Sequence, residues 1–318
     1  MSDKKLMVGG QAVIEGVMMR GPKLTATAVR DPQGQIQVET KPVNSIGDRF
    51  PILKKPFLRG TVSLIESLVI GMKSLSYSAK MAGEEDEQLS DKELAGTIVF
   101  ALVLASILFI AIPTGAAKLF HVITEDPVFL NLMEGFLRLG IFLLYIWGIS
   151  RMKDIRRVFQ YHGAEHQTIF CYEAGKPLTV ENVQQFPRLH PRCGTAFLLI
   201  VMLVSIFVFA FLGWPDLWLR IASRLVLLPV VAGISYEIIR LAGRSKNRLI
   251  HMAILPGLWL QHLTTRPPED DMVEVAIESL KAVLPPEEIL EGTGNYLDSA
   301  EERREEIMES QAAVEMNA

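Results

Sequence analysis

Long apolar runs separated by polar stretches dominate the chain, and this pattern predicts a membrane protein. Residues 95–117 are 23 consecutive uncharged positions, and residues 194–215 form a second uncharged run. A helix needs about 20 apolar residues to cross the roughly 30 Å hydrocarbon core of a bilayer. Both runs are therefore predicted to span the membrane, which excludes a fully soluble protein.

Two further apolar stretches, residues 128–150 and 217–239, have the length of a span but carry isolated charges. Each neighbours an uncharged run across a short loop. We therefore predict four spanning helices in total. The alternative is that these two stretches are buried helices of a soluble domain.

Charged residues inside spans are candidates for function, because placing them in lipid is costly. Glu134 and Arg138 lie four residues apart, so they share a helix face and are expected to neutralise each other. Arg220 and Arg224 are expected to extend toward the outer membrane interface instead.

The distribution of Lys and Arg predicts the orientation. The connection after the second span and the segment after the fourth are rich in Lys and Arg, whereas the loops at 118–127 and 213–217 together hold one Lys and no Arg. The long connections and both termini are therefore predicted to be cytoplasmic. The two cysteines would then lie in a reducing compartment, and a disulfide scaffold is excluded.

The fold class predicted is mainly α, with a small cytoplasmic β-hairpin element before the membrane helices. Residues 24–29 contain β-branched residues that favour a strand, and residues 36–40 alternate between apolar and polar side chains. The turn between them, at 31–34, contains Pro and Gly, which favour a hairpin. The segment Gly9–Pro22 has four glycines and is either a strand–turn element or a functional loop. The predicted regions are 1–57 (glycine-rich and hairpin), 58–94 (amphipathic helix and acidic linker), 95–243 (four spans, with a cytoplasmic insert at 151–194), 244–284 (interfacial segment and amphipathic helix) and 285–318 (charged mobile tail).

Two helix boundaries follow from local signals. Residues 151–161 can continue the second span as a helix into the cytoplasm. Pro256 and Gly257 interrupt an apolar stretch and predict a broken, re-entrant or interfacial piece. The net charge of −4 and the pI near 5.9 argue against a nucleic-acid partner and leave the lipid bilayer as the predicted one.

The cytoplasmic insert contains the sequence His162-Gly163-Ala164-Glu165-His166. On a helix, positions i and i+4 share a face, so both imidazoles can converge on one ion. Glu165 lies beside them and can act as a general base, as in the H-x-x-E-H metalloprotease motif. Gly163 weakens the helix and favours a kink at the motif.

His190 and Cys193, at the mouth of the third span, are the further candidate ligands. Two His with a third His or Cys suit zinc and leave a position for water, whereas all four together would make a closed structural site. Glu237 is a further candidate ligand, with a salt bridge to Arg240 or Arg244 as the alternative. The non-metal interpretation is that the histidines are surface or capping residues and that Cys193 and Cys171 are inert small hydrophobes.

The residues above resemble those of the YqhQ-like family (domain of unknown function 1385), a bacterial family sometimes labelled a predicted metal-dependent enzyme. The resemblance rests on Gly9–Pro22, His162–His166, the stretch His190 to Thr195, Pro256-Gly257 and residues 261–267. It covers about residues 6–285. It implies a multi-pass protein of the bacterial cytoplasmic membrane, and it supplies no activity.

Two functions compete at this point. The first is a zinc-dependent hydrolase at the cytoplasmic membrane face, acting on a lipid-linked or membrane-protein substrate. The second is a non-enzymatic scaffold or regulator that holds a structural metal or none. A transporter is a third option, and four spans would line a path only in a homo-oligomer.

Overall fold

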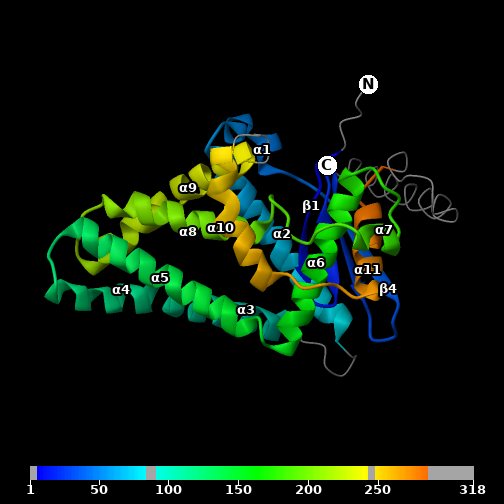
Figure 1. The fold of residues 1–318 in the computed structure, drawn as a ribbon, viewed down its shortest axis with the longest axis horizontal. Helices are drawn as coiled ribbons and strands as arrows, with labels where there is room; N and C mark the ends of the chain where they lie inside the picture. The colour runs from blue at the N-terminus through cyan, green and yellow to red at the C-terminus, as the bar shows by residue number, and fades with distance from the viewer. Residues whose placement is uncertain (1–5, 84–90, 243–247, 286–318) are drawn as a thin grey trace.

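The computed structural model describes residues 6–83, 91–242 and 248–285. In this part of the chain a small sheet, with helices on both faces, lies at one end of a bundle of long helices (Figure 1). The acidic linker at 84–87, Arg244 and the charged tail beyond residue 285 lie outside the described residues.

The sheet has four antiparallel strands in the order β1-β2-β3-β4, namely Gly9–Val13, Gly16–Arg20, Leu24–Arg30 and Ile36–Pro42. The pairing of β3 with β4 confirms the predicted hairpin. The glycine-rich segment forms a second hairpin, β1–β2, which the sequence left open between a strand–turn element and a loop. Its two-residue turn places Glu15 at a φ of +48°, the left-handed region that suits tight hairpins.

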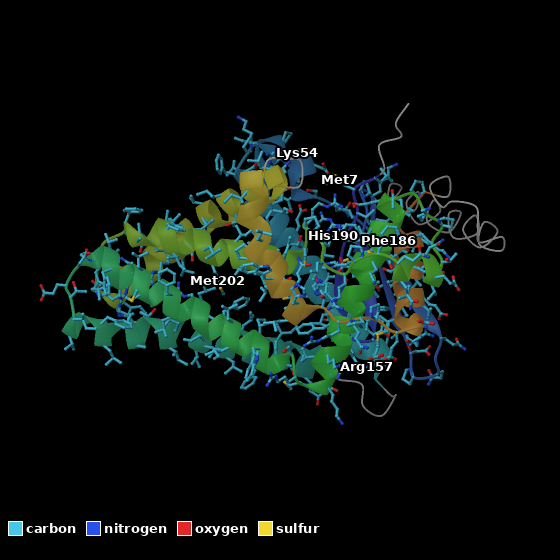
Figure 2. The ribbon with its side chains drawn as sticks, in the orientation of Figure 1. Met7, Lys54, Arg157, Phe186, His190 and Met202 are labelled. Carbon is cyan, nitrogen blue, oxygen red and sulfur yellow. The ribbon has the colours of Figure 1, made fainter. Side chains whose placement is uncertain are left out.

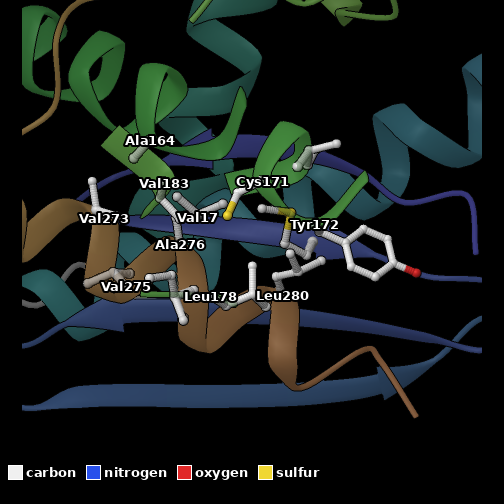
Figure 3. Packing of buried hydrophobic residues seen from close by; sticks show 14 of the residues in the cluster. Val17, Ala164, Cys171, Tyr172, Leu178, Val183, Val273, Val275, Ala276 and Leu280 are labelled. Atoms are coloured by element: carbon white, nitrogen blue, oxygen red, sulfur yellow. The ribbon is translucent and has the colours of Figure 1, made fainter. Parts of the chain in front are cut away.

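Helices cover both faces of this sheet. Helix α2 (Leu58–Ala82) packs on one face, and α6 (Lys153–Glu173) and α11 (Asp270–Lys281) pack on the other. Successive strand side chains point to opposite faces, so Met18 faces α2 while Val17 and Met19 join the core with α6 and α11. Figure 3 shows Val17 in this core. Both predicted amphipathic helices are thereby confirmed. Cys171 lies fully buried in the same core.

Three of the described helical segments are long and apolar enough to cross a membrane: Ala95–Ala116, Pro127–Ile149 and Leu217–Leu241. The first comprises α3 (Asp91–Ser106), a π-helical turn (Ile107–Ala111) and α4 (Ile112–Ala116), followed by a short 3-10 turn (Ala117–Val122); the others are α5 (Pro127–Ile149) and α9 (Leu217–Ala242). Helix α8 (Gly194–Ala210) is apolar but has only 17 residues. By length and composition, these helices suggest a membrane protein.

Two predicted boundaries are wrong. Helix α5 ends at Ile149, and α6 begins separately at Lys153, because the extended backbone at Met152 redirects the chain onto the sheet. Helix α10 (Arg248–Thr264) runs through Pro256 without a break. A Cβ on Gly257 would lie 2.7 Å from the Ala196 Cβ, so the glycine lets α10 pack directly on α8. That tertiary contact holds together a helix whose local sequence favours a break.

The charges within the apolar helices meet one another. Glu134 accepts a hydrogen bond of 2.8 Å from Arg138, as predicted. Arg224 also donates to both carboxylate oxygens of Glu134, and Arg220 lies 3.9 Å from the same carboxylate. The prediction that these two arginines extend toward the interface is therefore wrong, because a carboxylate on the neighbouring helix supplies a nearer partner.

Glu237 pairs with an arginine and not with the histidines. Its carboxylate accepts hydrogen bonds from Arg59 Nε (2.8 Å) and Nη2 (2.5 Å). The start of α2 approaches α9 closely at this point, since a Cβ on Gly233 would lie 2.8 Å from the Phe57 carbonyl oxygen. The partner of Glu237 is thus set by the packing of α2 on α9, a contact between segments far apart in the sequence.

Candidate metal centre

Helix α6 carries the histidine motif on its buried side. His162, Glu165 and His166 are 8%, 4% and 1% exposed. The helix is regular through Gly163, where a kink was expected. A Cβ on Gly163 would lie 2.1 Å from the Arg266 carbonyl oxygen, so this glycine lets the chain that follows α10 press against the motif.

Cys193 joins the two histidines from a different element. It is the N-cap residue of α8, and its Sγ accepts from the Thr195 N–H at 3.4 Å. The sulfur lies 3.2 Å from His162 Nε2. One ligand atom from each of His162, His166 and Cys193 lies within 4.8 Å of the others. Ligands of a tetrahedral zinc ion, at bonds of about 2.0–2.3 Å, are separated by roughly 3.5 Å, so this buried group can hold a metal ion.

Hydrogen bonds set the tautomers of both histidines. His162 Nδ1 donates to the Thr264 carbonyl at 2.8 Å, and His166 Nδ1 donates to the Arg188 carbonyl at 2.5 Å. A carbonyl only accepts, so each Nδ1 carries the proton and each neutral ring presents a lone pair at Nε2, as metal-binding histidines do. His166 Nε2 is buried and has no hydrogen-bond partner among the described residues, which fits a position left for an ion.

His190 lies beside this group, between the bundle and the sheet (Figure 2). Its ring centroid is 5.5 Å from that of His166. Its Nδ1 accepts the Arg192 N–H at 3.2 Å, so in the neutral ring the proton is on Nε2, which lies 3.8 Å from Glu173. Gln261 holds the backbone N–H and C=O of His190, both at 2.8 Å. The described geometry thus brings Cys193, rather than His190, to the histidine pair.

Glu165 lies at the edge of the group. Its Oε2 is 3.9 Å from His162 Nε2. The other side of the carboxylate faces strand β1, where a Cβ on Gly10 would lie 2.8 Å from Glu165 Cγ and Oε1. The side chain is therefore confined between the imidazoles and the strand backbone, in a position to reach a ligand of the ion.

The electrostatics of the group favour a thiolate. Burial alone would raise the pKa of Cys193, but the neighbouring His162 imidazole outweighs it and lowers that pKa well below its usual range. Burial likewise opposes the charged form of His162, yet Cys193 raises the pKa of His162 to about 9. Without an ion, His162 Nε2 is therefore protonated and donates to the sulfur, and a metal ion would bind the neutral ring by displacing that proton. Burial raises the pKa of Glu165, and the two imidazoles only partly offset this. A thiolate is the form of cysteine that binds metal.

Sequence reasoning missed the residues that orient the ligands. Thr264 and Arg188 act through their backbone carbonyls, and Gly10 acts through the side chain it lacks. Gln261 acts by clamping the backbone of His190. Gly10 and Gln261 both lie in segments singled out for their resemblance to a family, but neither residue type suggests a role without the fold.

The fold and the site define a helical membrane-type protein with a sheet unit and a buried His–His–Cys group. A family model described as "Protein of unknown function (DUF1385)" matches residues 55–286. The chain therefore belongs to the YqhQ-like DUF1385 family, which confirms the resemblance noted in the sequence.

One curated relative supports the same membership. The chain is 40% identical over 293 residues to "Uncharacterized protein YqhQ" of Bacillus subtilis (strain 168), and the match covers 87% of this chain and 92% of that protein. No solved structure matches the chain significantly. The family description names neither an activity nor a cofactor.

Proposed function

We propose that this protein is a metal-dependent hydrolase whose site lies where the membrane helices meet the sheet. The observation that carries the proposal is the convergence of His162, His166 and Cys193, with both Nδ1 atoms engaged by backbone carbonyls. Two imidazoles and a thiolate suit zinc, and three protein ligands leave a fourth position for water. Zinc, or a similar divalent ion, is the proposed cofactor.

Glu165 supplies the general base in this proposal. A bound zinc ion would lower the pKa of its water to about 7. The Glu165 carboxylate lies 3.9 Å from His162 Nε2, so it would be placed to accept the proton of a water molecule that attacks a carbonyl or phosphoryl group beside the histidines. Returning the proton to the leaving group completes the hydrolysis. The position beside apolar helices favours a lipid-linked or membrane-protein substrate.

The shared core of the sheet unit supports a four-span topology. Val17 precedes the first span, Ile169 follows the second and Met272 follows the last, yet all three belong to one hydrophobic cluster. Segments that pack together lie on one side of a membrane, so the chain crosses an even number of times between each pair of them. Short helix α8 is then the third crossing, and the Lys and Arg bias favours a cytoplasmic site with both termini inside a bacterial cytoplasmic membrane.

The test is complementation of a deletion strain, with protein levels checked by blot. Glu165→Gln should reach normal levels, keep its metal and fail to complement, because the base is lost while the ligands remain. Glu173→Gln is the matched control, since it lies on the same helix but pairs with Arg192 outside the group. Full complementation by Glu165→Gln would contradict the hydrolase proposal.

A structural metal in a membrane scaffold is the second candidate. The burial of all three ligands favours it, because closed sites with buried ligands are typical of structural zinc. In that case, Glu165→Gln complements fully, and removing any one ligand abolishes the folded protein. The sheet unit would then be the surface that binds partners.

A further inference from the structure

A charged cluster lies within the membrane helices, near the ends remote from the sheet unit. Glu134 of α5 is 1% exposed. Its carboxylate accepts from Thr114 Oγ1 (2.9 Å), Arg138 Nη2 (2.8 Å) and both terminal nitrogens of Arg224. Three of these donors meet Oε1 and only one meets Oε2, so Glu134 is engaged chiefly by Thr114, Arg138 and Arg224.

Two of the three arginines are well satisfied. Arg138 Nε donates to the Phe109 carbonyl at 2.8 Å. In a regular helix the Phe109 carbonyl would accept from the backbone N–H of residue 113, but Pro113 has no N–H. The Arg138 side chain supplies the missing donor. Arg224 completes its bonds with the Asn131 side-chain oxygen at 3.1 Å.

Arg220 is the exception. Its side chain is 5% exposed and lies 3.9 Å from Glu134, beyond hydrogen-bond distance. Its Nε and Nη1 are buried and have no hydrogen-bond partner among the described residues. The guanidinium lies 4.1 Å from the ring centroid of Trp214. The nearby Asp216 carboxylate caps α9 by accepting from Leu219 N–H at 2.9 Å.

The charges of this cluster therefore do not balance. Three guanidinium groups surround one buried carboxylate among the described side chains, which leaves positive charge in excess in an apolar region. A buried charge without a partner is strongly destabilising. The arrangement is complementary to an added anion.

An apolar groove begins beside the same cluster. It has a volume of about 560 Å³ and runs between the first span and the start of α9. Thr114, which bonds Glu134, lines one side, and Leu217 and Ile221, which flank Arg220 on α9, line the other. Further along, its walls are Val99, Val103, Ile107 and other apolar side chains of the first span.

We propose that this groove binds an anionic phospholipid, with its phosphate at Arg220 and one acyl chain along the first span. A lipid of this class matches both features in a single molecule, because its negative head meets the excess positive charge and its chain meets the apolar walls. A partner helix would match the groove but not the charge. The site is separate from the His–His–Cys group and does not depend on the proposed hydrolase activity.

The experiment uses the full-length protein, purified in detergent and stripped of lipid. Phosphatidylglycerol, phosphatidylcholine with the same chains, and inorganic phosphate are each titrated, with native mass spectrometry and the melting temperature as readouts. Phosphatidylglycerol should bind in about one copy and raise the melting temperature, whereas phosphatidylcholine should bind at least tenfold more weakly. Inorganic phosphate should have no effect at matched concentration, because it lacks the chain.

Two variants test the two halves of the site, and a third serves as the control. Arg220→Gln should weaken phosphatidylglycerol binding at least tenfold, and Ile107→Trp should do the same by filling the groove. Arg151→Gln is the control, since that arginine also stacks on a tryptophan, Trp147, at 3.8 Å but lies outside the cluster. If Arg220→Gln fails to fold, the groove variant and the lipid comparison still decide the matter. Equal binding of the two lipids, or unchanged binding in Ile107→Trp, would overturn the proposal.

Discussion

Gly10 of strand β1 lies directly against the side chain of Glu165 in helix α6. A Cβ on Gly10 would lie 2.8 Å from both the Cγ and the Oε1 of Glu165, closer than van der Waals contact permits. The glycine-rich hairpin therefore forms one wall of the candidate metal centre. This contact gives the segment Gly9–Pro22 a role beyond a turn, because the strand position decides where the carboxylate can lie.

The first prediction concerns this contact. Gly10→Ala should displace Glu165 and abolish complementation, because the added methyl occupies the space of the carboxylate. Overpacking of this kind costs typically 1–3 kcal/mol, and we expect about 1 kcal/mol because the clashing side chain can rotate. Gly9→Ala is the matched control, since no described atom lies within 4 Å of a Cβ there. Denaturant unfolding and complementation measure both, and equal behaviour of the two variants would contradict the assignment.

A second glycine should be far less tolerant. In Gly163→Ala the new methyl meets the Arg266 carbonyl oxygen at 2.1 Å, and a backbone atom cannot rotate away. The expected loss of stability is about 3 kcal/mol, at the upper end for overpacking. Gly148→Ala in α5 meets no described atom within 4 Å and should be neutral or slightly stabilising, because Ala favours a helix. A Gly163→Ala protein as stable as wild type would show that the chain after α10 does not press on the motif.

Metal content should separate His190 from the three converging residues. His162→Ala, His166→Ala and Cys193→Ser should each remove the ion, whereas His190→Gln should retain it, because the His190 ring engages Arg192 N–H rather than the group. Elemental analysis of the purified protein measures the stoichiometry, with close to one zinc per chain expected in the wild type. If a well-folded His190→Gln protein loses the metal while Cys193→Ser retains it, His190 is the ligand instead of Cys193.

Chelation should expose one cysteine to chemistry and leave the other unreactive. After metal removal, iodoacetamide should modify Cys193, while Cys171 stays protected in the hydrophobic core. The pKa of Cys193 is lowered, chiefly by His162 against the opposing effect of burial, so its thiolate forms at a lower pH than that of an ordinary cysteine. The alkylation rate should therefore rise less between pH 7 and 9 than that of an ordinary thiol of pKa about 8.5.

In His162→Ala, the same rate should fall at pH 7 and recover as the pH rises, because the thiol loses the neighbouring imidazole. Peptide mass spectrometry identifies the modified residue. A wild-type protein whose Cys193 reacts equally fast before and after chelation would contradict ligation by that sulfur.

The topology has its own test. Single cysteines introduced at Ile123 and at Met152, both exposed, should be labelled from opposite sides of intact cells, with 123 outside and 152 inside. The exposed positions 267, 269 and 270 should behave like 152, because they adjoin the helix that packs on the sheet. Labelling of position 152 from outside by an impermeant reagent would reverse the orientation and place the metal centre on an oxidising face.

Local sequence patterns determined much of the scaffold. The long apolar runs, the hairpin turn at 31–34 and the amphipathic periodicity of α2 and α11 are properties of consecutive residues, so the helices and the hairpin that they predict are present. Three of the four predicted spans have the length and composition to cross a membrane, and α8 is shorter. The spacing of His162 and His166 likewise brings both imidazoles to one face of a helix, since that relationship needs only the helical repeat.

Only the tertiary structure decided which residues complete the site and where the helices break. Helix α10 passes through Pro256 because Gly257 packs against Ala196, and the carbonyls of Thr264 and Arg188 set the histidine tautomers. These contacts join residues that lie far apart in the sequence, or act through backbone atoms that every residue type possesses. A local sequence pattern predicts neither long-range contacts nor contacts made by backbone atoms. The ligand set and the charged cluster can therefore be identified only from the packed helices.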